Sequence, residues 1–288
     1  MSIVIEHLNY VYMQGGPYET KALNDVSLTI NDGEFIGLIG HTGSGKSTLV
    51  QHLNGLIMPS SGRVLVDGLD LADKNTDRRA IRRRVGLVFQ YPENQLFEET
   101  VAKDIAFGPK NLGLDEAEID RRVRTAMRRV ALDYDKLAER SVFELSGGQM
   151  RRVAIAGVLA MEPQTLVLDE PCAGLDPRGR EEILGLISDL HRESGTTIVM
   201  VSHSMDDVAA LAERVIVMNH GSVVMDGTPR EVFAKGEELR AIGLDVPQAV
   251  ELAQKLREKG FDIPEGIYRM DEIRAAVEAV IGKGGRHA

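Results

Sequence analysis

The chain has 288 residues, a formal net charge of −10 and a single cysteine, Cys172. This length suits one large domain, or one domain with a small appendage. One cysteine excludes an internal disulfide framework and suits a reducing compartment. The acidic balance argues against a nucleic-acid-binding role, which normally requires a basic face. The chain has no charged-then-apolar start and no apolar run near 18 residues, so we expect neither a signal peptide nor a membrane-spanning helix.

The first third of the chain is predicted to be rich in β-strands. Residues 3–12, 22–30 and 62–71 have β-strand character, and the third segment contains a turn signal at Asp67-Gly68. Unbroken apolar runs follow at residues 35–40, 84–90, 165–170, 197–203 and 214–218. Such runs are typical of strands covered on both faces, so they predict a parallel sheet surrounded by helices.

The stretch "GHTGSGKST" (residues 40–48) joins an apolar strand to a helix and matches the pattern G-x-x-x-x-G-K-[ST]. Gly43 and Gly45 permit backbone conformations that turn successive N–H groups toward one anion, and the helix N-terminus adds its positive dipole end. Lys46 is predicted to reach the β- and γ-phosphates of a nucleotide, and the Ser47 hydroxyl to ligate Mg²⁺. The predicted phosphate-binding set is Gly40, His41, Thr42, Gly43, Ser44, Gly45, Lys46, Ser47 and Thr48.

The middle of the chain combines an arginine cluster with a helical block. Residues 77–84, "DRRAIRRR", are predicted to form a solvated helix face that leads into a strand. Residues 91–140 are rich in charge and lack strand-like runs, so they predict a mostly helical insertion between two strands of the sheet. The stretch "ELSGGQMRR" (residues 144–152) then resembles a second anion-binding loop, followed by a helix with one apolar face that ends before Pro163.

The strand "TLVLDEP" (residues 165–171) ends in two adjacent carboxylates. Neighbouring carboxylates repel each other unless a cation offsets them, so this pair predicts a metal-assisted reaction. Asp169 is predicted to hold Mg²⁺ through water, and Glu170 to polarise an attacking water as general base. After residue 229 the pattern changes to two short amphipathic helices, at residues 246–264 and 270–282, and residues 282–288 are expected to be frayed.

With "GHTGSGKST", "LSGGQ", "TLVLDE", "AGLD" and "TIVMVSH" in this order, residues 1 to about 230 resemble an ATP-binding cassette (ABC) ATPase. The resemblance implies an α/β P-loop NTPase fold, with a RecA-like core, an antiparallel β subdomain and a helical signature subdomain at about residues 91–160. The nucleotide-binding domain would span residues 1–230, and a small C-terminal helical domain residues 231–288.

The same resemblance implies roles for residues that would otherwise carry no signal. Gln90 would link Mg²⁺ and the lytic water to a transmembrane partner, and His203 would be the switch histidine. Asp176 would belong to the D-loop. Tyr12 would stack on adenine, with Tyr10 and Tyr18 as alternatives. The signature residues, which would act on ATP bound to a partner subunit, are Ser146, Gly147, Gly148 and Gln149.

The stretch from residue 85 to residue 113 resembles the ATPases of energy-coupling-factor (ECF) and cobalt-type importers, and is most similar to the second ECF ATPase paralogue. The resemblance implies ATP-driven import of a vitamin or a transition-metal ion at the cytoplasmic face of the cell membrane. Partners would be a second ABC ATPase subunit (a paralogue or a second copy), a transmembrane coupling protein and a substrate-binding membrane component, with no nucleic acid. The alternative is a soluble ABC ATPase that acts as an assembly or scaffold factor.

Two local features leave a choice open. Leu96 and Phe97 follow Gln90 in a charged block, so they either anchor a partner helix or pin the helical insertion to the core. Cys172 lies between Pro171 and the D-loop, where it is either a small residue in a turn or a thiol whose modification blocks subunit closure.

Overall fold

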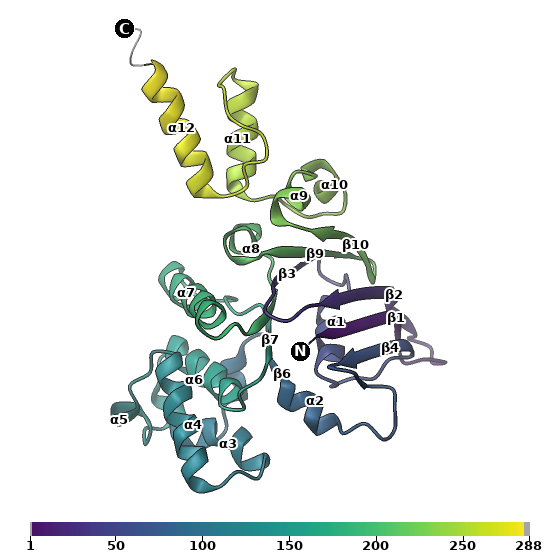
Figure 1. Cartoon of the computed structure of the whole chain (residues 1–288), viewed down its shortest axis with the longest axis vertical. Helices are drawn as coiled ribbons and strands as arrows, with labels where there is room; N and C mark the ends of the chain where they lie inside the picture. The colour runs from purple at the N-terminus through teal and green to yellow at the C-terminus, as the bar shows by residue number, and fades with distance from the viewer. Residues whose placement is uncertain (1, 285–288) are drawn as a thin grey trace.

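The computed structural model describes residues 2–284 and contains two β-sheets with helices around them (Figure 1). The larger sheet has the strand order β10-β9-β3-β8-β7-β6. The strands β9, β3, β8, β7 and β6 pair in parallel, and β10 pairs antiparallel with β9. The bounds are β3 (Phe35–Ile39), β6 (Val85–Val88), β7 (Thr165–Asp169), β8 (Thr197–Val201), β9 (Arg214–Asn219) and β10 (Ser222–Gly227). Every residue of β3, β6, β7 and β8 is buried, as their unbroken apolar runs predict.

The smaller sheet is antiparallel, with the order β2-β1-β4-β5. Its strands are β1 (Ile3–Tyr12), β2 (Thr20–Ile30), β4 (Ser61–Val66) and β5 (Leu69–Asp70). The predicted segment 62–71 is therefore two strands joined at Asp67 and Gly68, both of which have positive φ. The buried side chains of this sheet share one core with one face of the large sheet, which fixes the β1–β2 hairpin beside β3.

Helices cover the large sheet and fill the middle of the chain. Their bounds are α1 (Lys46–Leu53), α2 (Arg78–Arg84), η1 (Pro92–Gln95), α3 (Val101–Asn111), α4 (Glu116–Arg129), α5 (Tyr134–Leu137), η2 (Val142–Glu144), α6 (Gly147–Leu159), α7 (Pro177–Ser194), α8 (Met205–Leu211), α9 (Pro229–Phe233), α10 (Gly236–Ala241), α11 (Gln248–Glu258) and α12 (Met270–Gly284). The elements from η1 to α6 lie between β6 and β7, so the expected helical insertion is present. The arginine-rich α2 runs directly into β6, also as expected.

The signature helix α6 is buried more completely than its sequence predicts. Of the predicted face, which comprises Met150, Val153, Ala154, Gly157, Val158 and Met161, only Val153 is buried and the others are half-buried. Ile155, Ala156 and Leu159, which lie outside that face, are buried as well. The reason is that α6 is packed between α3, α4 and the sheet, so more than one side of the helix is covered. A single apolar face is the pattern of a surface helix, and α6 is an interior one.

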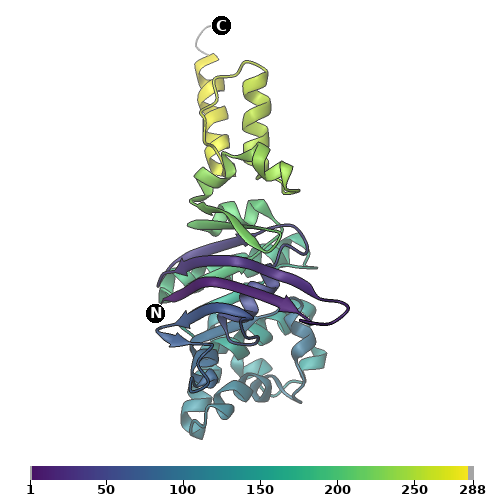
Figure 2. The same cartoon turned by 90° about the vertical axis from the view of Figure 1, so that its right-hand side faces the viewer.

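The C-terminal segment falls into two parts. Val232, Phe233 and Leu239 belong to the main hydrophobic core, so α9 and α10 pack against the cassette. The helices α11 and α12 instead form a hairpin with its own small apolar cluster, which includes Ala249 and Ile273. Figures 1 and 2 show this hairpin standing away from both sheets, at the end opposite α3 and α4. Of the segment expected to be frayed, residues 285–288 lie outside the described residues.

Within residues 2–284, no helix is long and apolar enough to cross a membrane.

Phe233→Ala is expected to lower the free energy of unfolding of the main domain by about 3–5 kcal/mol, because loss of a large side chain would leave a cavity in the main core. Ile273→Ala is the control, since Ile273 is equally buried but packs within the hairpin. It should leave the main unfolding transition within about 0.5 kcal/mol of the unmodified chain. Urea denaturation measures the change in unfolding free energy for both variants. Equal losses from the two substitutions would contradict this division of the core.

Candidate nucleotide-binding site

A cavity of about 550 Å³ opens where the carboxyl ends of β6, β7 and β8 meet the loop before α1 and the β1–β2 hairpin. In parallel sheets this edge is the usual place for a ligand. The cavity is lined by Tyr12, Thr20, Lys21, Ala22, Thr42, Gly43, Gly45, Lys46, Ser47, Thr48, Gln90, Glu170 and His203. The fold therefore brings most of the predicted nucleotide-binding and catalytic residues to one place.

The loop of residues 40–48 has the backbone geometry that an anion cradle requires. Gly43 and Gly45 have φ values of 83° and 104°, which side-chain-bearing residues rarely adopt. Gly45 is also the N-cap of α1, and a Cβ there would lie 2.7 Å from the Ala22 carbonyl oxygen. Ser44 is fully buried within the loop, and His41 is held by a 3.0 Å contact from its Nε2 to Asn219 Oδ1. The cradle is thus preformed.

Lys46 and Asp169 are charged groups in a buried setting. The Lys46 Nζ donates to the carbonyl oxygens of Gly40 (2.6 Å) and His41 (3.0 Å), so the ammonium is held inside the loop. Burial lowers the pKa of Lys46, and the nearby Glu170 and Asp169 carboxylates partly restore it. Burial raises the pKa of Asp169, the Glu170 charge raises it further, and a hydrogen bond from Ser47 opposes both effects. The ionised form of Asp169 is therefore disfavoured by its surroundings.

Glu170 is held from two sides at the end of β7. Gln90 Nε2 donates to Glu170 Oε2 at 2.9 Å, and His203 Nε2 lies 2.9 Å from Glu170 Oε1. The backbone of Glu170 has a φ of 52°, an uncommon conformation for a non-glycine residue and one often found at functional sites. Three residues from the ends of three adjacent strands are thus joined through one carboxylate. They are the three residues predicted to be catalytic.

Tyr12 is the tyrosine that reaches this cavity. Its hydroxyl lies 3.1 Å from Thr48 Oγ1, and its ring is packed edge-on by Tyr10. Tyr10 turns toward the buried His52, and Tyr18 is an exposed residue of the hairpin loop. Of these three tyrosines, only Tyr12 lines the cavity in the described structure. The geometry therefore favours Tyr12 over the two alternatives as an aromatic platform.

The signature stretch lies outside this cavity, since none of residues 144–149 is found in its described lining. Ser146 caps α6 by accepting a hydrogen bond from Gln149 N (3.3 Å), while Ser146 N donates to Gln149 Oε1 (3.1 Å). A Cβ added to Gly147 or Gly148 would meet no described atom within 4 Å. The monomer therefore gives no steric reason for either glycine. Asp176 similarly caps α7, accepting from Gly179 N at 2.7 Å.

Comparison with known proteins gives a consistent result. A family described as "ABC transporter" matches residues 23–173. The energy-coupling factor transporter ATP-binding protein EcfA2 of Symbiobacterium thermophilum is 62% identical over 281 residues, which cover 98% of this chain and 97% of the relative. The protein of the same name from Clostridioides difficile is 59% identical over 282 residues, covering 98% of each chain. The chain belongs to the ABC transporter family, in its energy-coupling factor branch.

Two solved structures support the fold of this family. One is cbiO1 from Clostridium perfringens, part of the ABC transporter complex cbiONQ, with a TM-score of 0.73 and 42% identity over 88% of this chain and 98% of that one. The other is the ATP-binding cassette MJ0796 in a dimeric post-hydrolysis state bound to ADP and Pi, with a TM-score of 0.70 and 30% identity over 79% and 98% of the two chains. The predicted fold and family are confirmed. Membership makes the chain an ATPase whose hydrolysis is coupled to transport.

Several residues of the site carry no signal in the sequence. Thr20, Lys21 and Ala22 line the cavity only because β2 pairs with β1 beside the phosphate loop. Arg151 follows "LSGGQ" on a helix, where an arginine would ordinarily be exposed, yet it is 1% exposed. It contacts Glu93 and the segment after Glu170. Its position two residues after "LSGGQ" is the one clue in the sequence.

Arg180, on α7, is a second such residue. Its guanidinium hydrogen-bonds Ser204 and Asp207 (Nη2 to Oδ1, 2.7 Å) at the start of α8, next to His203.

Burial raises the pKa of the neighbouring Cys172 to about 11, so this thiol is protonated at neutral pH and is a weak nucleophile.

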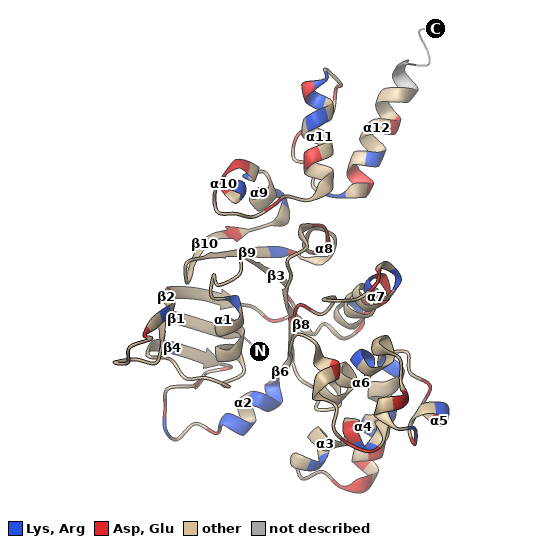
Figure 3. Ribbon diagram, turned by 180° about the vertical axis from the view of Figure 1, so that it is seen from behind, with Lys and Arg blue, Asp and Glu red and all other residues tan. Residues whose placement is uncertain are grey.

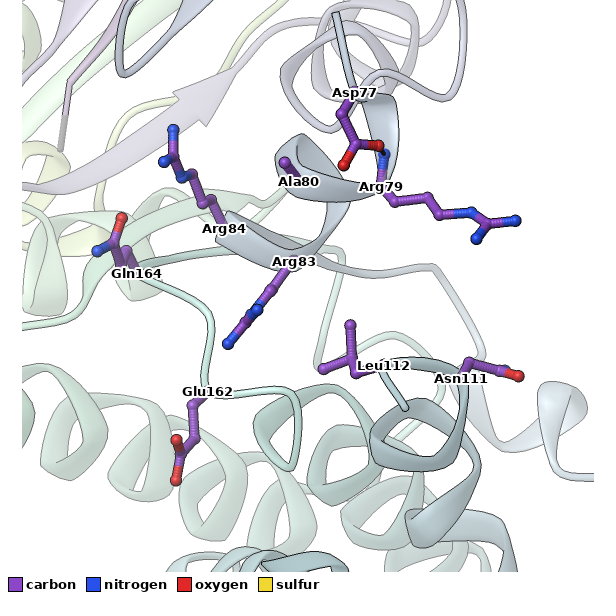
Figure 4. A pocket seen from close by; sticks show the side chains of 9 residues that line it. All are labelled: Asp77, Arg79, Ala80, Arg83, Arg84, Asn111, Leu112, Glu162 and Gln164. Atoms are coloured by element: carbon purple, nitrogen blue, oxygen red, sulfur yellow. Dashed lines mark hydrogen bonds between the residues drawn. The ribbon is translucent and has the colours of Figure 1, made fainter. Parts of the chain in front are cut away.

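A second cleft, of about 500 Å³, lies between α2, the end of α3 and the segment that joins α6 to β7 (Figure 4). Arg79, Arg83 and Arg84 of α2 line one side, and Asn111 and Glu162 line the other. Figure 3 shows the ribbon of α2 mostly in blue, because five of its seven residues are arginines. Within residues 2–284, neither Arg79 nor Arg83 has an ion pair. The acidic chain therefore keeps one locally basic surface exposed.

The fold places Leu96 and Phe97 in different environments. Leu96 is 8% exposed and packs in the main core, whereas Phe97 is 58% exposed. Phe97 stacks edge-on against Phe107, which is itself 45% exposed, with ring centroids 4.9 Å apart. Phe107 lies one turn of α3 before Asn111, so this aromatic pair and the basic cleft are neighbouring parts of one face. The core interpretation therefore applies to Leu96, and of the two residues only Phe97 is exposed enough to contact a partner.

Asp169→Asn is expected to stabilise the nucleotide-free protein at neutral pH, because the amide lacks the charge that burial and Glu170 disfavour. A carboxyl whose pKa is raised by folding makes stability fall as the pH rises from its unfolded pKa to its folded pKa. The advantage of the variant should therefore be present at neutral pH and vanish once the pH falls below the ordinary pKa of aspartate. Thermal unfolding midpoints across this pH range measure it. A midpoint at neutral pH below that of the unmodified chain would contradict the charge imbalance.

Proposed function

We propose that the chain is the second ATPase subunit of an ECF-type importer, and that it powers uptake of a vitamin or a transition-metal ion by hydrolysing MgATP at a site shared with another ATPase subunit. The observation that carries the proposal is the separation of two anion-binding elements. The loop of residues 40–48 lines the cavity, while the signature glycines face open space elsewhere. A shared site gives both elements a use.

In this proposal, ATP lies in the cavity with adenine against Tyr12 and its phosphates over residues 40–48. A phosphate in the loop would offer Lys46 an anionic partner in place of two carbonyl oxygens. Glu170 is the general base. Gln90 and His203 each occupy one lone pair of its carboxylate oxygens, which orients the group and leaves further lone pairs free to accept a proton from water.

The residues around Asp169 suit Mg²⁺. A serine hydroxyl, a buried carboxylate and an amide oxygen are hard oxygen donors, and Mg²⁺ sites at phosphates commonly use one or two carboxylates together with water. The raised pKa of Asp169 comes from burial and from the Glu170 charge, and a cation beside the two carboxylates would offset both. Ser47, Gln90 and Asp169 would hold the ion. It would neutralise charge on the phosphates and so favour attack by water.

The signature residues would act on the partner's nucleotide. Ser146, Gly147, Gly148 and Gln149 form the start of α6, where backbone N–H groups and the helix dipole favour an anion. Such a terminus is too weak to bind ATP alone, but it can close over a γ-phosphate that a second subunit presents. The related cassette MJ0796 is a dimer in its post-hydrolysis state with ADP and Pi, which supports this arrangement. Asp176 would lie at the same interface.

A membrane partner would dock on the face formed by Phe97, Phe107 and the basic cleft. Exposed aromatic side chains next to arginines are typical of interface anchors. Relatives named as energy-coupling factor transporter ATP-binding proteins, and a solved structure that is part of the ABC transporter complex cbiONQ, support partners in a transporter complex. These partners would be a transmembrane coupling protein and a substrate-binding membrane component, with this subunit at the cytoplasmic face of the membrane. Residues 1–230 would form the ATPase domain. Residues 231–288 would help to hold the two ATPases, this chain and a paralogue or a second copy, together.

Glu170→Gln is expected to lower turnover at the chain's own site by about 10²–10⁴-fold while ATP binding is retained, because the amide cannot accept the proton from water. Gly148→Asp should instead abolish hydrolysis at the partner's site, since a carboxylate there would repel the γ-phosphate. Single-turnover assays of the complex, with nucleotide loaded at one site at a time, measure both. Near-normal turnover of Glu170→Gln, or loss at the wrong site for Gly148→Asp, would contradict the proposal.

Phe97→Asp is expected to uncouple transport while leaving ATP binding intact, because a charge replaces an exposed apolar anchor that does not line the cavity. Val224→Asp is a suitable control, since Val224 is 47% exposed on β10, away from α3. Co-purification of a membrane partner from detergent extracts and uptake in vesicles are the two measurements. If co-purification and uptake are both unchanged in Phe97→Asp, the proposal that this face docks a membrane partner is wrong. If the unmodified chain recovers no multispanning partner, the soluble scaffold function gains support instead.

A further inference from the structure

Arg151 is the largest fully buried side chain of the described residues, and it lies on the signature helix. Its Nε and Nη2 donate to the two carboxylate oxygens of Glu93, at 3.0 and 2.8 Å. Its Nη1 donates to the carbonyl oxygens of Pro171, at 3.0 Å, and Ala173, at 2.8 Å. One guanidinium thus ties three separate segments together.

Each of the three segments carries a part of the proposed catalytic machinery. Glu93 follows Gln90 by three residues, and Pro171 directly follows Glu170. Arg151 is five residues along α6 from Ser146, which is about 7.5 Å of helix. Any displacement of the start of α6 therefore reaches the segments of Gln90 and Glu170 through fixed, charge-assisted bonds.

Packing alone does not account for this arginine. Removing a guanidinium from water is unfavourable, and an apolar side chain of similar size would fill the same space at least as well. What an apolar side chain could not do is hold a carboxylate bidentately and two carbonyl oxygens at once. The arrangement therefore indicates a geometric role rather than a purely stabilising one.

We infer that Arg151 is a positioning residue for hydrolysis, which holds the signature helix in place relative to the segments of Gln90 and Glu170 and so supports the geometry of both nucleotide sites to which this chain contributes. The inference rests on the proposed function, in which α6 acts on the partner's ATP. Arg151 does not line the cavity. It acts through Glu93 and the backbone after Glu170.

The neighbouring residue provides a matched control. Arg152 is on the same helix and donates to Val130 O (3.1 Å) and to Glu182 (2.6 Å). It also pairs with a glutamate, through a single Nη2 bond at a more exposed position, but its bonds go neither to the segment of Gln90 nor to that of Glu170. A general requirement for ion pairs on α6 would affect both arginines alike.

The test uses the full transporter complex with its second ATPase, in two backgrounds. Glu170→Gln leaves turnover at the partner's site, and Gly148→Asp leaves turnover at the chain's own site. In both backgrounds, Arg151→Met should lower kcat about 10–100-fold, because small misplacements of catalytic groups have effects of this size. The KM for ATP should change less than about threefold, because Arg151 does not touch the nucleotide. Arg151→Lys should recover only part of the loss, because an ammonium lacks the planar fork.

Two further measurements complete the test. Adding Glu93→Gln to Arg151→Met should lower kcat by no more than about twofold further, since both remove one interaction. Arg152→Met should leave kcat within about twofold of its value in each background. If Arg151→Met does not fold, Arg151→Lys and Glu93→Gln are judged by the same criteria. Arg151 variants that behave like Arg152→Met, or that raise KM without lowering kcat, would overturn the inference.

The proposed function can fail separately. If Glu170→Gln or Gly148→Asp alone does not silence the expected site, the shared-site proposal is wrong whatever the Arg151 variants do. If both backgrounds behave as proposed and the Arg151 variants match the control, only the inference about Arg151 fails.

Discussion

Two adjacent carboxylates at the end of a buried strand are the constraint on which the rest of the site depends. Asp169 and Glu170 repel each other, and burial raises the pKa of Asp169. The positive charge of Lys46 partly offsets this repulsion. Gln90 and His203 also contact the carboxylate of Glu170. The resulting cavity suits a polyphosphate accompanied by a cation, because the cation would balance both the phosphates and the two carboxylates.

The sequence predicted those parts of the site whose chemistry is local. A phosphate loop works through its own backbone, so "GHTGSGKST" could be interpreted without knowing what lies around it. Unbroken apolar runs likewise predicted the parallel sheet. Features that depend on long-range packing were not accessible. The bonds of Arg151, the lining residues Thr20 to Ala22 and the different environments of Leu96 and Phe97 follow only from how distant segments meet.

The separation of the cavity from the signature helix is the feature that makes a single subunit incomplete. Gly147 and Gly148 border open space that nothing in the described chain fills, and neither glycine lines the cavity. The basic cleft and the Phe97–Phe107 pair form another exposed face, along α2 and α3. In this account, one face binds a second ATPase and the other a membrane protein. Residues such as Arg151 and Arg180 link the segments between them.

The central claim is that ATP joins two subunits by lying between the phosphate loop of one and the signature helix of the other. The most direct measurement is sedimentation of the Glu170→Gln chain with its partner ATPase, with and without nucleotide. The account predicts that MgATP tightens their association and that ADP does not, because the γ-phosphate is the group that the signature helix would contact. Association that is the same with MgATP, with ADP and without nucleotide would contradict it.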